Sequence, residues 1–214
     1  MNAAIRKENS LPLVTGFLFA WAGIGIQLVD MLQHRQQPVL QSLIKFFSYF
    51  TILTNLLVAL YFTASLFFSN SRTGIFSRKY TTVTALTVYI LVVGLIYNLL
   101  LRQIWTFTGW GLISNELLHT ITPLYFLGYW FLVVKKSTLS YKTALYWTIY
   151  PIAYTAYSLI RGVVVDSYPY PFIDVTLLGY AKVFINSIGI AVLFLALFYT
   201  FIAIGNRLAQ KQKI

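Results

Sequence analysis

Three polar side chains recur on one side of an apolar segment early in the chain. Residues 45–55 read KFFSYFTILTN, in which Ser48, Thr51 and Asn55 are three and four residues apart and Thr54 lies beside them. In an α-helix such positions share one face. A serine or threonine hydroxyl acts as a nucleophile when a neighbouring base removes its proton. The alternative is helix packing, because small hydroxyl residues let membrane helices approach and hydrogen-bond one another.

A histidine lies at the centre of the second cluster, residues 115–123, which read NELLHTITP. Glu116 and His119 are three residues apart and can touch on one helical face. Pro123 has no N–H to donate to the His119 carbonyl, so we expect a kink and a freed acceptor there. A neutral imidazole in this position suits a general base. The alternative is a histidine that is hydrogen-bonded within the helix bundle.

Metal and cofactor sites are not predicted. Glu116 and His119 form one E-x-x-H motif, whereas a di-iron bundle needs two such motifs and two further carboxylates. The chain has no cysteine, and haem binding through His119 alone has no other support. The expectation is a protein without metal or other cofactor.

Two arginines stand at the predicted ends of apolar segments, Arg102 after the third and Arg161 at the end of the fifth. Their usual role is to reach the lipid headgroups with the charge while the stem stays in apolar surroundings. A guanidinium also binds a carboxylate, here either that of Glu116 or that of a lipid substrate.

The elements that position these residues follow from composition. Hydrophobic residues make up 58% of the 214 residues and charged residues only 10%. The apolar residues come in blocks of roughly twenty, the length of a helix that crosses a bilayer. The sequence therefore predicts an all-α polytopic membrane protein of about six transmembrane helices, forming a single transmembrane domain over residues 1–214. The predicted helices are residues 11–31, 46–68, 80–101, 115–134, 143–162 and 183–205.

The net charge of +11 reflects membrane topology and not nucleic-acid binding, because the basic residues lie between apolar blocks. Most of the 16 Lys and Arg residues fall on one predicted side, which marks that side and both termini as cytoplasmic. This set consists of Arg6, Lys7, Arg72, Arg78, Lys79, Lys135, Lys136, Lys142, Arg207, Lys211 and Lys213. The expectation is a multi-pass plasma-membrane protein whose polar clusters face the outer side, with membrane lipids as its surroundings.

Two predicted outer connections look ordered. Residues 105–111 read WTFTGWG, an aromatic and glycine-rich stretch typical of an interfacial segment. Residues 168–174 read YPYPFID, in which two prolines restrict the backbone. Either connection belongs to an aromatic belt or forms a lid.

Three of these motifs resemble a known family. The stretch KFFSYFTILTN, the pair His119–Thr120 followed by Pro123, and YPFID at residues 170–174 occur in the order seen in the bacterial six-helix proteins called Pr-six-Pr. Those proteins are related to the animal androgen-induced and androgen-dependent membrane proteins, which hydrolyse fatty acid esters of hydroxy fatty acids. The resemblance spans most of the chain, from the second helix to the last outer loop.

The resemblance implies a set of roles. Ser48 falls where the animal enzymes carry a threonine nucleophile, and His119 falls at their catalytic histidine. Thr51 stands where those enzymes have an aspartate, Asn55 where they have a glutamine, and the proline follows the histidine one residue sooner. Tyr170 and Asp174 match a Tyr-Pro-Phe-Leu-Glu stretch and are expected at the substrate.

The combined prediction is an intramembrane lipid-ester hydrolase with Ser48 as nucleophile and His119 as general base. Thr51, Thr54, Asn55 and Glu116 are possible alternative nucleophiles or supporting residues. Substrate contacts are expected from Arg102, Arg161, Tyr170 and Asp174. The alternative function is a small-molecule transporter or lipid-binding membrane protein without hydrolysis. The sequence does not predict the oligomeric state.

Overall fold

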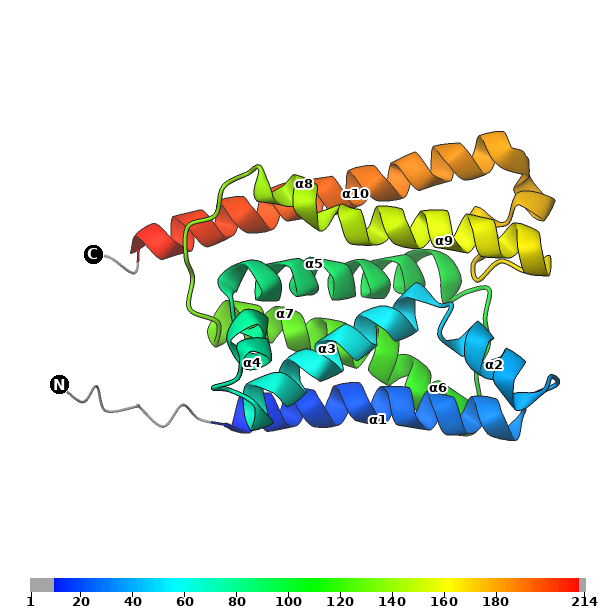
Figure 1. Ribbon diagram of the computed structural model, residues 1–214, viewed down its shortest axis with the longest axis horizontal. Coiled ribbons are helices and arrows are strands. Elements are labelled where there is room, and N and C mark those ends of the chain that lie inside the picture. The colour runs from blue at the N-terminus through cyan, green and yellow to red at the C-terminus, as the bar shows by residue number, and fades with distance from the viewer. Residues whose placement is uncertain (1–9, 212–214) are drawn as a thin grey trace. The chain divides into compact units, whose positions relative to one another are not determined.

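The structure of the protein, a computed structural model, describes residues 10–211 and is helical throughout (Figure 1). It is 81% helix, and the described residues contain no strand. Arg6, Lys7 and Lys213, which contributed to the predicted orientation, lie outside the described residues. The elements are α1 (Leu11–Gln33), α2 (Val39–Phe46), α3 (Phe50–Phe67), α4 (Arg72–Ser77), α5 (Tyr80–Ile96), η1 (Tyr97–Leu101), α6 (Gly109–Glu116), η2 (Leu117–Ile121), α7 (Thr122–Leu132), α8 (Thr143–Trp147), α9 (Ile149–Val165), η3 (Pro171–Ile173) and α10 (Val175–Lys211).

Each of the six predicted segments contains a helix, and four helices in the described part of the chain are long and apolar enough to cross a membrane. These four are α1, α3, α5 together with η1, and α10. The predicted fourth segment is the run α6–η2–α7, and the fifth is α8 followed by α9. The all-helical fold class is therefore confirmed, with four candidate membrane-spanning helices.

One helix boundary differs from the prediction at the predicted nucleophile, Ser48. The second apolar helix was expected from Phe46, but α2 ends there and α3 begins at Phe50. Ser48 lies in the break between them, so the prediction that Ser48 and Thr51 share a helical face was wrong. The Ser48 hydroxyl donates to the carbonyl of Ile44 at 2.5 Å. Side chains of this kind offer the backbone an alternative to the helical bond.

The last helix is longer than expected, because Asp174 caps it. The Asp174 carboxylate accepts hydrogen bonds from the backbone N–H groups of Thr176 (2.9 Å) and Leu177 (3.2 Å). A carboxylate in this position satisfies amides that have no partner inside the helix. Gly179, with φ of 74°, then interrupts the helical backbone near its start.

The chain divides into two compact units. Within the described residues, unit 1 contains 10–30 and 54–134, and unit 2 contains 31–53 and 135–211. The first turn of α3 therefore belongs to unit 2 and the rest of that helix to unit 1.

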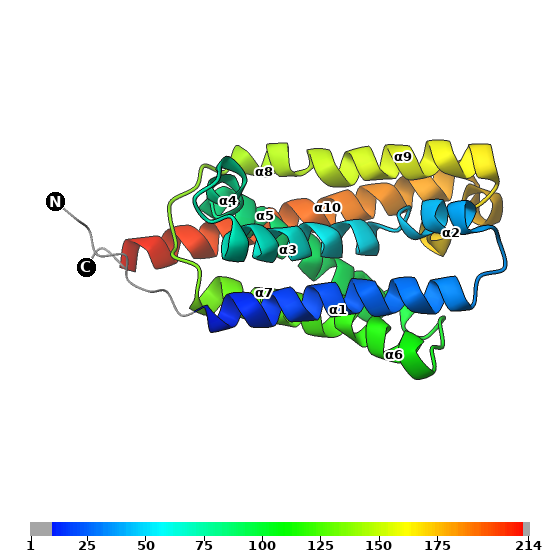
Figure 2. The same ribbon diagram turned by 60° about the horizontal axis from the view of Figure 1, so that its bottom comes forward.

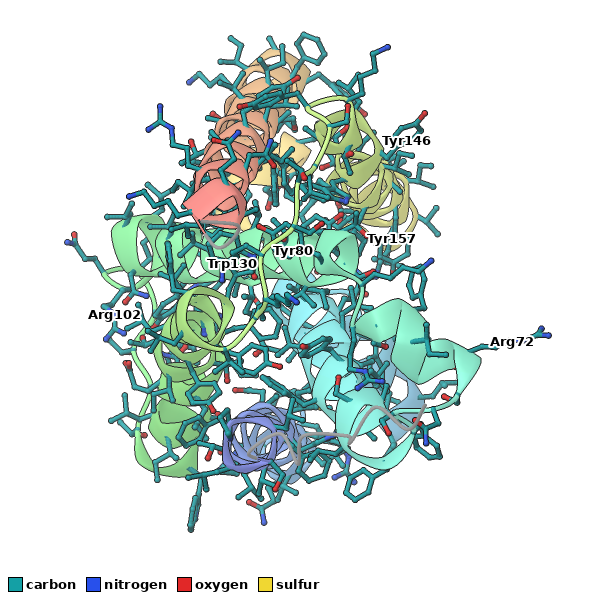
Figure 3. All side chains as sticks on the ribbon, turned by 90° about the vertical axis from the view of Figure 1, so that its left-hand side faces the viewer. Arg72, Tyr80, Arg102, Trp130, Tyr146 and Tyr157 are labelled. Carbon is teal, nitrogen blue, oxygen red and sulfur yellow. The ribbon has the colours of Figure 1, made fainter. Side chains whose placement is uncertain are left out.

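In unit 1 the most deeply buried helix is α5, which packs against α7. The indole N–H of Trp130 donates to the Thr84 hydroxyl at 3.0 Å, and the Trp130 ring stacks on Tyr80 with centroids 6.2 Å apart (Figure 3). The helices α1 and α7 lie side by side (Figure 2), joined where the Tyr125 hydroxyl donates to the Pro12 carbonyl at 2.7 Å. Bonds of this kind satisfy polar groups within an apolar bundle.

In unit 2 α9 lies beside α10 (Figure 2). The amide of Asn206 on α10 both donates to the Leu139 carbonyl (3.0 Å) and accepts from the Leu139 N–H (2.7 Å). Asn186 on the same helix donates to the Phe172 carbonyl at 2.9 Å. These two amides fix irregular backbone segments against a long apolar helix.

We predict that Gly94→Val destabilises unit 1 more than Gly128→Val does. A Cβ at Gly94 would meet the Pro123 side chain at 3.0 Å and the His119 carbonyl oxygen at 3.1 Å, whereas a Cβ at Gly128 meets nothing within 4 Å. Overpacking of this kind costs about 1–3 kcal/mol. Thermal unfolding of both variants in detergent measures the difference. Equal midpoints for the two variants would contradict the close contact of α5 with α7.

Candidate functional site

Pro123 determines the backbone around His119. The N–H of Thr122 bonds to the carbonyl of Leu117, five residues earlier, so residues 117–121 form a turn of π-helix. Pro123 has no N–H and cannot continue this pattern, which leaves the carbonyls of Leu118 and His119 without helical partners. Turns of π-helix are rare in proteins overall, and those that occur are often found at functional sites.

Two asparagine side chains donate hydrogen bonds to the freed carbonyls. Asn55 on α3 donates to the Leu118 carbonyl at 3.1 Å, and Asn98 in η1 donates to the His119 carbonyl at 3.1 Å. The predicted freed acceptor at His119 is therefore confirmed, and Asn98 is its partner. Asn55, expected beside the nucleophile, instead supports the backbone at the histidine. The sequence did not single out Asn98, although a freed carbonyl needs a donor.

The imidazole of His119 is held in one tautomer. Its Nδ1 lies 3.0 Å from the carbonyl of Asn115, and because a carbonyl only accepts, Nδ1 carries the hydrogen and donates it. The ring also stacks on Tyr97, with centroids 4.0 Å apart and 26° between the planes. In the neutral ring Nε2 is then unprotonated and can accept a proton.

Tyr97 is held by the same helix that carries the histidine. The Asn115 side-chain amide donates to the Tyr97 hydroxyl at 2.6 Å, and Tyr97 is almost completely buried. Asn115 therefore fixes the ring of His119 through its carbonyl and the stacking partner through its side chain. Neither residue was singled out from the sequence, although Asn115 stands four residues before His119.

Glu116 pairs with Arg102 and does not orient His119. The two side chains form a forked ion pair with N–O distances of 2.7 and 2.8 Å, partly exposed at 40% and 30%. Arg102 also donates to the side-chain oxygens of Asn98 (2.8 Å) and Thr120 (3.0 Å). The hydrogen bond with Glu116 raises the pKa of Arg102 above its ordinary value. This network ties η1 to η2 beside the histidine.

Ser48, the predicted nucleophile, belongs to unit 2. Its side chain is 1% exposed, and its hydroxyl donates to the Ile44 carbonyl and lies 3.1 Å from the Tyr157 hydroxyl. The Ser48 carbonyl accepts from the Tyr154 hydroxyl at 2.9 Å. Two tyrosines of α9 therefore hold the break between α2 and α3.

Tyr170 holds the other side of the same break. The Tyr170 hydroxyl accepts from the Thr51 N–H at 3.2 Å and lies 3.3 Å from the Thr51 hydroxyl. Burial raises the pKa of Tyr170 to about 12, so the phenol stays neutral. The 168–174 connection is thus ordered by a buried hydrogen bond. The predicted substrate roles of Tyr170 and Asp174 stay predictions, because Tyr170 holds Thr51 and Asp174 caps α10.

The predicted site residues thus fall into two groups. The group in unit 1 comprises Thr54, Asn55, Arg102, Glu116 and His119, and the group in unit 2 comprises Ser48, Thr51, Arg161, Tyr170 and Asp174. Thr54 is completely buried. The described residues contain no cluster of three or more His, Cys, Asp or Glu side chains that could hold a metal ion.

Comparison of the chain with protein-family models, with curated proteins and with solved structures found no match.

The tautomer of His119 gives a direct test of the site. The chain has two histidines, so His34→Gln leaves His119 as the only one. We predict that ¹⁵N NMR of this variant, labelled at histidine, shows the form protonated at Nδ1, because the Asn115 carbonyl accepts that hydrogen. A spectrum of the Nε2-protonated form would contradict the assignment of a free Nε2.

A second prediction concerns Asn98. We expect Asn98→Leu to lower the stability of the protein by about 1–3 kcal/mol, because it leaves the His119 carbonyl without a donor. Gln103→Leu, in the exposed turn that follows, serves as the control. Thermal unfolding in detergent checks both variants. Unchanged stability of Asn98→Leu would mean that the carbonyl finds another donor.

Proposed function

We propose that the protein crosses the plasma membrane six times, with both termini in the cytoplasm. The runs α6–η2–α7 and α8–α9 would be the two spans beyond the four apolar helices. The asymmetry of Lys and Arg between the two sides supports this orientation. In this arrangement His119 and Ser48 lie near the outer face.

We further propose that the protein hydrolyses lipid esters, such as fatty acid esters of hydroxy fatty acids, with His119 as the general base. The observation that carries this proposal is the fixed imidazole, whose Nδ1 is committed to the Asn115 carbonyl while Nε2 keeps its lone pair. A base needs this arrangement, because the same nitrogen must take a proton and later return it. The π-helical turn at the histidine adds support.

Ser48 is the proposed nucleophile, on the resemblance to the membrane hydrolases. Its oxygen would attack the ester carbonyl once a base has taken the hydroxyl proton, the role that the resemblance implies for His119. The proton then passes to the leaving alcohol, and water cleaves the resulting acyl-serine. The Ser48 hydroxyl must first leave the Ile44 carbonyl, to which it donates in the resting structure. Thr51 and Thr54 are the alternative nucleophiles.

A second candidate function is lipid binding or transport without hydrolysis. The bond from Ser48 to Ile44 favours it, because a hydroxyl that donates to a backbone carbonyl has a structural role in the helix break. The two functions differ in whether any hydroxyl is activated.

The first experiment is labelling of the detergent-solubilised protein with a fluorophosphonate probe. We expect the wild type to be labelled and Ser48→Ala to lose labelling, because alanine lacks the oxygen that the probe modifies. His119→Ala should lose labelling at least about 100-fold, because general base catalysis contributes that much. Ser42→Ala and His34→Ala are matched controls that should keep it. An unlabelled wild type, or variants labelled as strongly as the wild type, would reject the hydrolase with these residues and favour lipid binding.

A further inference from the structure

Arg161 carries a charge that the described protein does not neutralise. One terminal nitrogen donates to the Ser167 carbonyl at 3.0 Å, while Nε is buried without a hydrogen-bond partner. Among residues 10–211 no carboxylate forms an ion pair with Arg161. A buried donor of a charged group is costly when it stays unpaired. Among the described residues the Ser167 carbonyl is therefore an acceptor for one terminal nitrogen, while Nε is left without one.

The position of this guanidinium is fixed by the end of α9. The helix ends at Val165, and Asp166 adopts a left-handed conformation with φ of 50°, which turns the chain back. A Cβ at Gly162 would lie 2.0 Å from the Tyr168 ring, so only glycine allows this ring to lie so close to α9. The close approach brings the Ser167 carbonyl to Arg161, which holds the side chain before any ligand arrives.

The guanidinium of Arg102, in contrast, has an ion-pair partner and further hydrogen-bond acceptors within the protein. It binds Glu116 through two nitrogens and donates to Asn98 and Thr120 as well. The sequence predicted both arginines as candidates for a carboxylate. The structure separates them, because Arg102 has an internal carboxylate and Arg161 has none among the described residues.

The surroundings of Arg161 combine phenols with apolar surface. Tyr157 stands one turn earlier on α9, is 44% exposed, and contacts the Ser48 hydroxyl. Burial raises the pKa of Tyr49, and the nearby Arg161 charge opposes that rise. Ile160 and Val164 on α9 are exposed at 67% and 77%. An amphipathic ligand matches this combination, with its anionic group on the arginine and its chain along α9.

We propose that Arg161 binds the anionic headgroup of an acyl lipid, either a carboxylate or a phosphate. Both present paired oxygens that match the planar donors of a guanidinium. As a statement about substrate it rests on the proposed function and means that the hydrolase takes esters with a free anionic end. The binding itself needs no hydrolysis, so it can be tested separately.

The test measures binding of oleate and of methyl oleate to the full-length protein in phosphatidylcholine nanodiscs. We expect oleate to bind more tightly than its methyl ester, and Arg161→Gln to weaken oleate binding about 10-fold or more without affecting the ester. Arg161→Lys should recover only part of the loss, because an ammonium lacks the planar fork. Arg207→Gln, an exposed arginine of α10, is the matched control.

The source of the anion is resolved by adding phosphatidic acid to the nanodiscs. Retention of phosphatidic acid by the wild type, its competition with oleate and its loss in Arg161→Gln would assign a phosphate headgroup. Oleate binding that phosphatidic acid leaves unchanged would assign a carboxylate. Equal affinity of wild type and Arg161→Gln for both anions, with both variants folded, would overturn the proposal. So would a loss of binding in Arg102→Gln alone. A wild type that binds oleate but never hydrolyses an ester would reject only the hydrolase.

Discussion

The need of each backbone carbonyl for a donor is the constraint on which the rest of this structure depends. In apolar surroundings an unpaired carbonyl destabilises the fold, because no water is present to donate a hydrogen bond to it. Pro123 removes one donor in the middle of a long helix, and the π-helical turn before it leaves a second carbonyl exposed. Asn55 and Asn98 supply the missing hydrogens from two other helices. The proline thus makes α3, α5 and the histidine turn depend on one another, and Gly94 provides the space in which α5 meets His119 and Pro123.

The same constraint explains the second irregular segment. Between α2 and α3 the helical pattern fails, and the hydroxyls of Ser48, Tyr154 and Tyr170 provide the bonds that the helix does not. Both irregular segments are built from ordinary side chains, and both carry residues of chemical interest. Irregular backbone in a membrane protein is tolerated only where protein groups satisfy it. A site at such a place is rigid because its bonds cannot be given up without cost.

The two arginines of the candidate sites, Arg102 and Arg161, differ in how their charges are paired. Arg102 and Glu116 neutralise each other and link η1 to η2, so their charges serve the fold around the histidine. Arg161 is held by a single carbonyl and keeps a buried N–H without a partner. One arginine therefore has a structural role that the protein completes itself. The other has no carboxylate partner among the described residues, which is why we propose an anionic lipid as its ligand.

The sequence by itself determined the helical class, because blocks of about twenty apolar residues have no other stable form in lipid. It also determined the freed carbonyl at His119, since a proline lacks an N–H wherever it stands. Tertiary structure alone decided that Asn98 meets that carbonyl, that Glu116 pairs with Arg102, and that Ser48 lies in a break and not on a helical face. The physical reason is that the local sequence decides which polar groups lack a hydrogen-bond partner within their own helix. Which residue becomes the partner depends on which helices pack together.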